Sequence, residues 1–304
     1  MADLDLAALQ IFKTVAEEGG ITKAAAKLHR VQSNVTTRVK QLEAKLGTPL
    51  FLRQRRRLVL SPEGRTLLAY ADQLLRLSSE AQAVVQGGAP RGTLRLGTLE
   101  STAASRLPPI LSRYHLAHPQ VGLELVTGTT AALVAKVLNY EIEAAFVAEP
   151  FAAQNLDSQI AFEEELILIA PASFPKIKEP KNIGRQTVIA FTTGCAYRRR
   201  LEDWLARADV VPDRVMEFSS YHAIVACVAA GAGIAVVPRS VIGAIAVKDE
   251  VAAYPLPASV SKAQTRLIWR HGHRSTALDA LRAELERKTR SPVRRKKATG
   301  GIRP

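Results

Sequence analysis

The sequence has few cysteines, few aromatic residues and no long apolar run. Its 304 residues include two cysteines, Cys195 and Cys227, which are too few for a disulfide framework and suit a reducing compartment. The longest apolar stretch, residues 223–238, is shorter than a membrane span, and its glycines divide it into a predicted helix and a predicted strand. With 47% hydrophobic and 5% aromatic residues, the composition is typical of an α/β protein.

Sequence signals for export and for catalysis are also missing. The N-terminal segment MADLDLAALQ lacks the basic region and apolar core of a secretory signal, so we expect a cytoplasmic protein without a membrane partner. No Gly-rich phosphate loop, paired-carboxylate motif or metal-ligand cluster occurs, and His271 and His273 beside a strand end are expected at the surface. We therefore predict no catalytic residues, no metal and no cofactor.

Positive charge is present in excess, but only at the two ends of the chain. The formal net charge is +14. Residues 1–60 contain 11 Lys and Arg against 5 Asp and Glu, residues 287–304 contain 8 against none, and the other 226 residues contain 23 of each. A neutral body with a basic N-terminal region favours a polyanion-binding unit joined to a body with another task. Residues 287–304 have no hydrophobic period and are predicted to be disordered.

The N-terminal region has the pattern of a small helical domain with a hairpin. Apolar spacing predicts helices over residues 4–18, 21–29 and 32–47, and two short apolar runs around RQRRR predict a hairpin with an arginine-rich tip. In the third helix Val35, Val39, Leu42 and Leu46 share one face. The opposite face is polar and contains Thr36, Thr37, Arg38, Lys40 and Gln41.

A single long helix is predicted over residues 62–86, followed by a linker, QGGAPRG. Its apolar and small residues alternate three and four apart, which is typical of a coiled-coil seam and also of a buried helix. We favour dimerisation through this seam, which contains Leu67, Ala71, Leu74, Ser78, Ala81 and Val85.

From residue 93 onward, predicted strands and helices alternate, which is typical of an open sheet with helices on both faces. The strand over 264–272 and the final helix over 275–288 follow a second set of alternating elements, so two lobes are expected. The predicted domains are residues 1–61, a linker helix over 62–90, a body over 91–286 and a tail over 287–304. Lobe I would hold 91–162 and 267–286, and lobe II 163–266.

Residues 24–53, AAAKLHRVQSNVTTRVKQLEAKLGTPLFLR, resemble the N-terminal pattern of the LysR-type transcriptional regulators without a gap. The matches include Gln32, Glu43, Gly47, Phe51 and Arg53, while SPEG at 61–64 and VAAGAGIAVVP at 228–238 are similar to later family motifs. The resemblance implies an α/β protein with an N-terminal winged helix-turn-helix, a long linker helix and a two-lobed effector-binding domain like that of periplasmic binding proteins. Val31 replaces the family's usual Ser at the helix start, so Ser33 or Asn34 is expected to cap it.

The resemblance implies that the third helix enters the major groove of double-stranded DNA, and the residue chemistry agrees. Gln32 and Asn34 suit adenine, Arg38 suits guanine, and a methyl group of Thr36 or Thr37 can meet that of thymine. Contacts to phosphates are expected from Lys23, His29, Arg30, Lys40, Arg55, Arg56 and Arg57. The remaining predicted contacts are Thr22, Ser33, Gln41 and Arg53. A homodimer or homotetramer would bind a partly symmetric operator, and RNA polymerase is left open as a further partner.

An effector site is expected between the lobes, where strands end and helices begin. Hydroxyls and free amides there suit an anion, although Glu100 would repel one unless Arg198 or Arg199 offset it; an amino acid would satisfy both signs. The ligand is therefore expected to be a small organic anion or an amino acid. The predicted residues are Glu100, Ser101, Thr102, Thr129, Thr130, Thr193, Gly194, Cys195, Tyr197, Ser219 and Ser220.

Three alternatives compete with a ligand-responsive regulator. Cys195 at a helix start near three arginines resembles the reactive cysteine of peroxide-sensing family members, but no second cysteine follows shortly after it. An enzyme using Cys195 and His222 lacks a residue to orient the histidine. A solute-binding protein would share the two lobes, but the missing signal and the basic N-terminal region oppose it. A DNA-binding regulator is the favoured interpretation.

Overall fold

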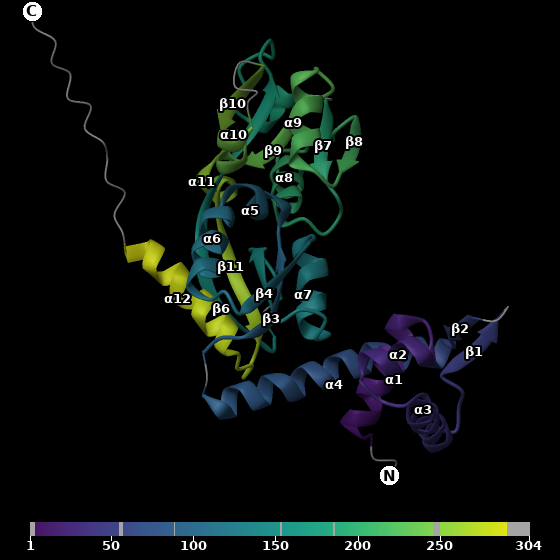
Figure 1. The fold of residues 1–304 in the computed structure, drawn as a ribbon. Helices are drawn as coiled ribbons and strands as arrows, with labels where there is room; N and C mark the ends of the chain where they lie inside the picture. Colours follow the sequence, from purple (N-terminus) through teal and green to yellow (C-terminus); the bar gives the residue numbers. More distant parts are fainter. Residues whose placement is uncertain are drawn as a thin grey trace, which may run out of the picture. The chain divides into compact units, whose positions relative to one another are not determined.

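The computed structural model describes residues 4–54, 57–87, 89–152, 154–184, 186–245 and 250–290, without the side chains of residues 57, 83, 86 and 288–290 (Figure 1). The chain forms two compact units, Met1–Gly88 and Ala89–Pro304. Each unit has its own hydrophobic core.

The N-terminal unit is a three-helix core with a two-stranded hairpin and one long helix. Its apolar helix faces meet in the centre, where Phe12, Val15 and Val35 are fully buried. Its elements are α1 (Leu6–Glu18), α2 (Ile21–Lys27), α3 (Gln32–Leu46), β1 (Phe51–Gln54), β2 (Arg57–Leu60) and α4 (Pro62–Gln86).

Local interactions fix the junction between α3, the hairpin and α4. The carboxylate of Glu43 accepts the backbone N–H groups of Leu50 (2.8 Å) and Phe51 (3.2 Å), which anchors the start of β1 on α3. Ser61 caps α4 by accepting the Gly64 N–H over 2.8 Å. A Cβ at Gly64 would lie 2.1 Å from the Leu50 carbonyl oxygen, so this close approach requires glycine.

The predicted seam of helix α4 is buried in its first part and exposed farther along. Its first part packs inside the unit: Ala71 is fully buried, and Leu67 contacts the cluster formed by α1 and α3. The expectation that the whole seam serves a partner chain is therefore wrong for this part, because α1 already covers it. Apolar side chains farther along remain exposed, among them Leu74, Leu77 and Val85, the last with 86% of its surface exposed.

The second unit is built on one long mixed sheet in the order β10-β6-β11-β5-β3-β4, with β9 also paired to β6. Its first elements are β3 (Gly92–Thr98), α5 (Glu100–Ser105), α6 (Pro108–Ala117), β4 (Val121–Thr127), α7 (Thr130–Leu138), β5 (Ala144–Ala148) and β6 (Leu156–Pro171). They are followed by a 3-10 turn (Pro180–Ile183), β7 (Thr187–Phe191), α8 (Ala196–Ala206), β8 (Arg214–Phe218), α9 (Tyr221–Ala229), β9 (Ala235–Pro238), α10 (Arg239–Ala244), β10 (Val251–Pro255), α11 (Ala258–Ser261), β11 (Lys262–Arg270) and α12 (Thr276–Arg290).

Strand β6 joins two lobes. Residues 156–160 and 162–165 pair with β11 in lobe I, and residues 166–171 pair with β9 and β10 in lobe II. The parallel pair β7–β8 completes lobe II. In lobe I, helices α6 and α12 cover one face of the sheet and α7 the other (Figure 1), with Tyr114, Leu281 and Leu133 fully buried beneath them. The α/β architecture with a hairpin-bearing helical N-terminus is confirmed.

Several short elements were not predicted, namely α5, α10, α11, β10 and the first half of β6. Helix α12 also continues to Arg290, so the first four residues of the expected tail are helical; residues 291–304 lie outside the described part of the chain. The apolar stretch 223–238 forms most of α9 and then β9. Within the described residues, no helix combines the length and apolarity needed to span a membrane.

Candidate nucleic-acid interface and interlobe pocket

Helices α2 and α3 present an exposed polar face. A tight turn joins them, with His29 at φ +52° and Arg30 exposed beside it. The buried residues Val35, Val39 and Leu42 fix the rotation of α3, so the other face points to solvent. Exposed on this surface are Thr22, Lys23, His29, Arg30, Gln32, Ser33, Asn34, Thr37, Arg38, Lys40, Gln41 and Arg53. Thr36 is half-buried, and its hydroxyl donates to the Gln32 carbonyl over 2.9 Å.

The expected cap of α3 is absent. The helix begins at Gln32 with Val31 as N-cap and no side-chain hydrogen bond there, so the prediction that Ser33 or Asn34 caps it is wrong. Both residues lie within the first turn, where their own backbone is already helical. The Asn34 side chain instead accepts from Arg30 over 3.4 Å, which leaves the first amides of α3 for water or a ligand.

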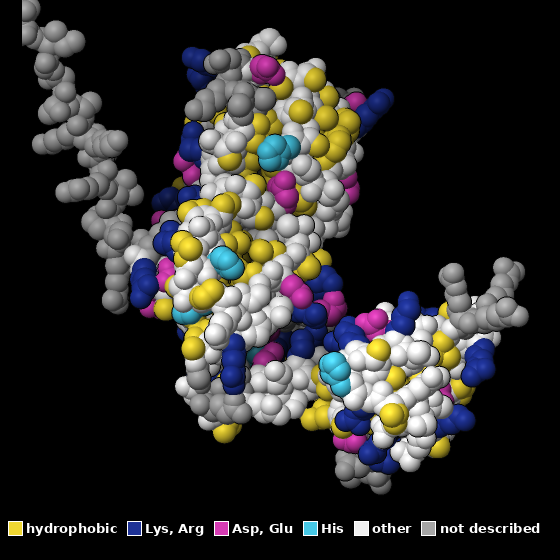
Figure 2. Space-filling view, viewed as in Figure 1, with side chains coloured by type: hydrophobic (Ala, Val, Ile, Leu, Met, Phe, Trp, Pro, Cys, Tyr) yellow, Lys and Arg dark blue, Asp and Glu magenta, His cyan; other side chains and the backbone are white. Residues whose placement is uncertain are grey.

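Two groups of basic residues in the N-terminal unit differ in whether they form ion pairs. Lys13 pairs with Asp72 over 2.5 Å and Lys27 pairs with Glu18 over 2.7 Å. In the described part of the chain, the second group forms no ion pair; it contains Lys23, Arg38, Lys40 and Arg53. Figure 2 shows basic side chains around the α3 surface. Charges without an internal partner are available to a polyanion.

Only part of the arginine set predicted on the hairpin lies among the described residues. Phe51 pairs with Leu60 and Gln54 with Arg57, so the tip lies between residues 54 and 57. Arg53 is exposed on β1. Arg55 and Arg56 lie outside the described residues, as does the side chain of Arg57.

Residues of both lobes line two neighbouring cavities, a larger one of about 640 Å³ and a small one of about 10 Å³. Glu100, Ser101, Thr129, Cys195 and Tyr197 line the small cavity as predicted. Phe191 and Tyr221 also line it, and the sequence analysis did not predict them. Phe191 ends β7 and Tyr221 begins α9, and strand ends and helix starts were the positions used to predict the other lining residues. Thr102, Ser219 and Ser220 line neither this cavity nor the larger one beside it.

Two threonines at the cleft form hydrogen bonds with the protein backbone. The Thr129 hydroxyl accepts the Ala132 N–H at the start of α7, over 3.3 Å. Thr130 exchanges hydrogen bonds with the backbone of Ala148, also over 3.3 Å, and thereby ties α7 to β5. Their hydroxyls are therefore engaged already, which agrees with capping more than with ligand binding.

Glu100 is the acidic group of the pocket. Its Oε1 accepts the Tyr221 N–H over 3.4 Å at the start of α9, and His222 Nδ1 lies 3.9 Å away. Its Oε2 is buried without a hydrogen-bond partner among the described residues. Burial raises the pKa of this carboxyl, because desolvation disfavours its charged form.

Arg198 does not offset Glu100, contrary to one expectation. Its guanidinium donates to Glu202 and to Glu217, both over 2.6 Å. Helix α8 directs it toward these carboxylates, and it instead borders the adjacent cavity of about 640 Å³. Arg199, Thr193 and Gly194 line that larger cavity too.

Cys195 is not the activated thiol that its position suggested. It is the N-cap of α8, but only 7% of its surface is exposed, and its sulfur lies 3.9 Å from the Tyr221 hydroxyl. Burial raises the pKa of the thiol and outweighs the nearby helix amides and Arg198, which lower it. A thiol held protonated and shielded from solvent is unsuited to peroxide sensing.

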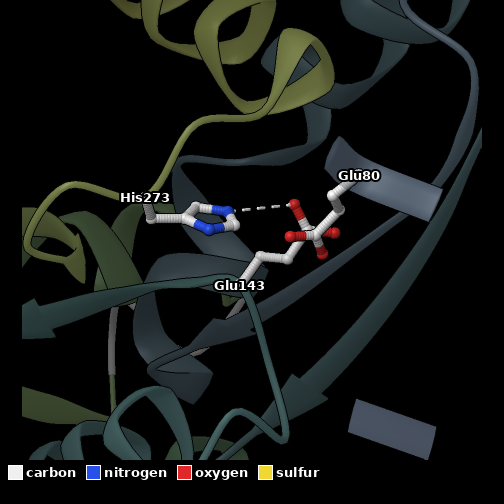
Figure 3. A group of neighbouring side chains, drawn as sticks. All are labelled: Glu80, Glu143 and His273. Carbon is white, nitrogen blue, oxygen red and sulfur yellow. Dashed lines mark ion pairs between the residues drawn. The ribbon is translucent and has the colours of Figure 1, made fainter. Parts of the chain in front are cut away.

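His271 and His273 face different carboxylates. His271 lies 3.0 Å from Asp157 and is exposed, as expected. His273 was expected at the surface, but its side chain is only 5% exposed and pairs with Glu143 over 3.6 Å (Figure 3). The two histidines therefore do not converge on one site.

A helix-turn-helix with an unpaired basic face, together with a two-lobed domain around a pocket, is the architecture of a DNA-binding regulator with an effector-binding domain. The chain belongs to the LysR family: residues 6–65 match the bacterial regulatory helix-turn-helix protein model of that family, and residues 87–290 match the LysR substrate binding domain. The chain is thus a DNA-binding transcriptional regulator with an effector-binding domain.

Known proteins agree with this assignment. The chain is 43% identical over 263 residues to the HTH-type transcriptional regulator YusT of Bacillus subtilis, covering 86% of this chain and 88% of the relative. It is 38% identical over 268 residues to the regulator GltR of the same species, covering 88% and 90%. A full-length OxyR variant from Pseudomonas aeruginosa shares the fold at 22% identity and TM-score 0.69, covering 93% of this chain and 95% of that chain.

A second solved structure is similar in fold. CbnR complexed with its target DNA has a TM-score of 0.65 at 23% identity, covering 93% of this chain and 99% of that chain.

Proposed function

We propose that this regulator reads an operator through α3 and that a small molecule in the interlobe pocket modulates its activity. The observation that carries the DNA-binding part is the α3 face, where Arg38 and Lys40 are exposed and form no ion pair within the described residues. The solved complex of CbnR with its target DNA, which shares the fold, supports the same use of the N-terminal unit.

Base contacts and phosphate contacts are divided by side-chain chemistry. Arg38 would bind guanine through two hydrogen bonds, Gln32 would bind adenine, and the Thr37 methyl would meet thymine. Lys23 and Lys40 would bind phosphates and set the register. Asn34, already held by Arg30, would read a base only by exchanging that partner.

A dimer would match two half-sites of a partly symmetric operator. The exposed apolar residues of α4, including Tyr70, Leu74 and Leu77, support an interface with a second copy of the chain. We infer a homodimer or homotetramer that acts in the cytoplasm as a binding protein, not as an enzyme.

The test of DNA reading is Arg38→Ala. A binding site is first selected from random duplexes, and affinities are then measured by fluorescence anisotropy on that site and on a scrambled duplex. We expect the variant to lose roughly 1–3 kcal/mol on the selected site, to relax specificity at one base step, and to lose much less on the scrambled duplex. Equal losses on both duplexes would contradict the base-reading role.

The test of ligand sensing is a thermal melt of the purified, reduced protein against amino acids, aromatic acids, small dicarboxylates and sugar phosphates. A ligand at a hundred times its dissociation constant adds roughly 2.7 kcal/mol of stability. The same ligand should change the affinity for the selected duplex, because the proposal couples the two sites.

A further inference from the structure

The small interlobe cavity is lined by an acidic side chain and by no Lys or Arg among the described residues, whereas the larger interlobe cavity beside it is lined by Arg198 and Arg199. Among the described residues that line the small cavity, Glu100 is the one acidic side chain, and none is basic. Arg198 is paired with Glu202 and Glu217, and Arg199 lines the neighbouring cavity instead. The small cavity therefore lacks the cation that would normally recognise an anionic ligand, and a ligand that fills it meets Glu100 before it reaches Arg199.

Glu100 also takes the position that a ligand carboxylate would need. The N-terminus of α9 has no side-chain cap, and its first N–H, from Tyr221, donates to Glu100. A carboxylate from a ligand would have to displace Glu100 and then remain beside it, and two carboxylates in one desolvated site repel each other.

The remaining hydrogen-bonding capacity favours a donor. Oε2 of Glu100 is buried and has no partner in the described part of the chain. Leaving such an oxygen unsatisfied is costly, and a charged donor would relieve that cost. The rings of Phe191 and Tyr221 stack at 5.1 Å on the same wall, and aromatic faces attract cations.

We propose that the interlobe pocket recognises its ligand through a primary ammonium group bound to the Glu100 carboxylate. The inference rests on the proposed function, because it assigns a ligand class to the effector pocket. It makes the amine of the ligand essential and the carboxylate of an amino acid dispensable. Because the small cavity holds only about 10 Å³, the two lobes must separate before a ligand can enter it. They would separate where Gly194, at φ +93°, lies against Thr129.

The experiment compares ligands that share a skeleton and differ in charge. The full chain is melted and titrated by calorimetry with n-butylamine and phenethylamine, and with butyrate and 3-phenylpropionate, all at millimolar concentration. We expect the amines to raise the melting temperature and the acids to leave it unchanged. Glu100→Gln should weaken amine binding by about 10- to 100-fold, since a hydrogen bond to a charged group is lost.

Glu163→Gln is the matched control. Glu163 is an exposed carboxylate on β6 and lines neither cavity, so its variant should bind amines as the parent chain does. Glu100→Asp keeps the charge and should retain part of the affinity, which separates charge from folding. Shifts from the acids alone, equal amine binding by Glu100→Gln, or silence from both amines would each overturn the inference. DNA affinity of the same preparations tests the DNA-binding proposal separately.

Discussion

Arginines on α3 and arginines in the effector-binding domain have the same chemistry, but they differ in whether a carboxylate neutralises them. Arg38 is exposed and forms no ion pair within the described residues. Arg106 donates to the buried Glu164 carboxylate over 2.7 and 2.9 Å, and Arg198 is held by two carboxylates. The unpaired Arg38 is available to a polyanion, whereas Arg106 and Arg198 form ion pairs within the protein.

The comparison shows why net charge alone identifies no site. The second unit contains many arginines, yet several of them, including Arg106, Arg198 and Arg239, are neutralised by neighbouring carboxylates. A cation is available for binding only when the fold leaves it without a partner. Substitutions that remove paired and unpaired cations should therefore have separable effects on stability and on binding.

The largest effect is expected from Arg106→Ala. It leaves Glu164, whose side chain is 2% exposed, with Ser240 as the side-chain donor that remains among the described residues, and should lower the free energy of unfolding by about 3 kcal/mol. The measurement is denaturant unfolding followed by circular dichroism.

The neighbouring pair provides the control for that measurement. Arg239 and Glu165 are each 54% exposed, so Arg239→Ala should cost less than about 1 kcal/mol. Similar losses for Arg106→Ala and Arg239→Ala would show that burial of the carboxylate does not set the difference.

A smaller effect, on binding and not on folding, is expected from Lys40→Ala. Removing one phosphate contact should weaken binding to all duplexes alike and reduce the salt slope of log K by about 1. Lys27→Ala removes a lysine that is paired with Glu18 and should change the slope less. The measurement is anisotropy over a series of salt concentrations; equal slopes for the two variants would contradict the division into paired and unpaired lysines.

The smallest effect concerns Cys195. Its native pKa is raised, so above the ordinary pKa of a thiol the unfolded chain loses a proton that the folded chain keeps. Stability should therefore fall slightly as pH rises through that range, and Cys195→Ser should remove this part of the fall.

Alkylation gives a direct measure of the same thiol. In a Cys227→Ser background, iodoacetamide should modify the folded protein far more slowly than the unfolded protein. Rapid alkylation of folded Cys195 would restore the redox alternative.

Sequence patterns predicted most of the regular structure because those elements follow from local periodicity. The apolar spacing of Val35, Val39 and Leu42 determines both the existence of α3 and the face that it exposes. The elements that sequence reasoning missed, such as α10 and α11, are too short to show a period. The cap of α3 was mispredicted because Ser33 and Asn34 are good cap residues in general, whereas the turn at His29 places the helix start before them.

The motif resemblance over residues 24–53 predicted the family, composition located the basic N-terminal unit, and local periodicity predicted which side chains α3 exposes. Which charges have partners became clear only in the folded chain. Glu202 and Glu217 reach Arg198 from two different elements, and burial among α8 and α9 keeps Cys195 protonated. Ion pairing and desolvation depend on distances between residues that are far apart in the chain, and a linear pattern does not contain those distances.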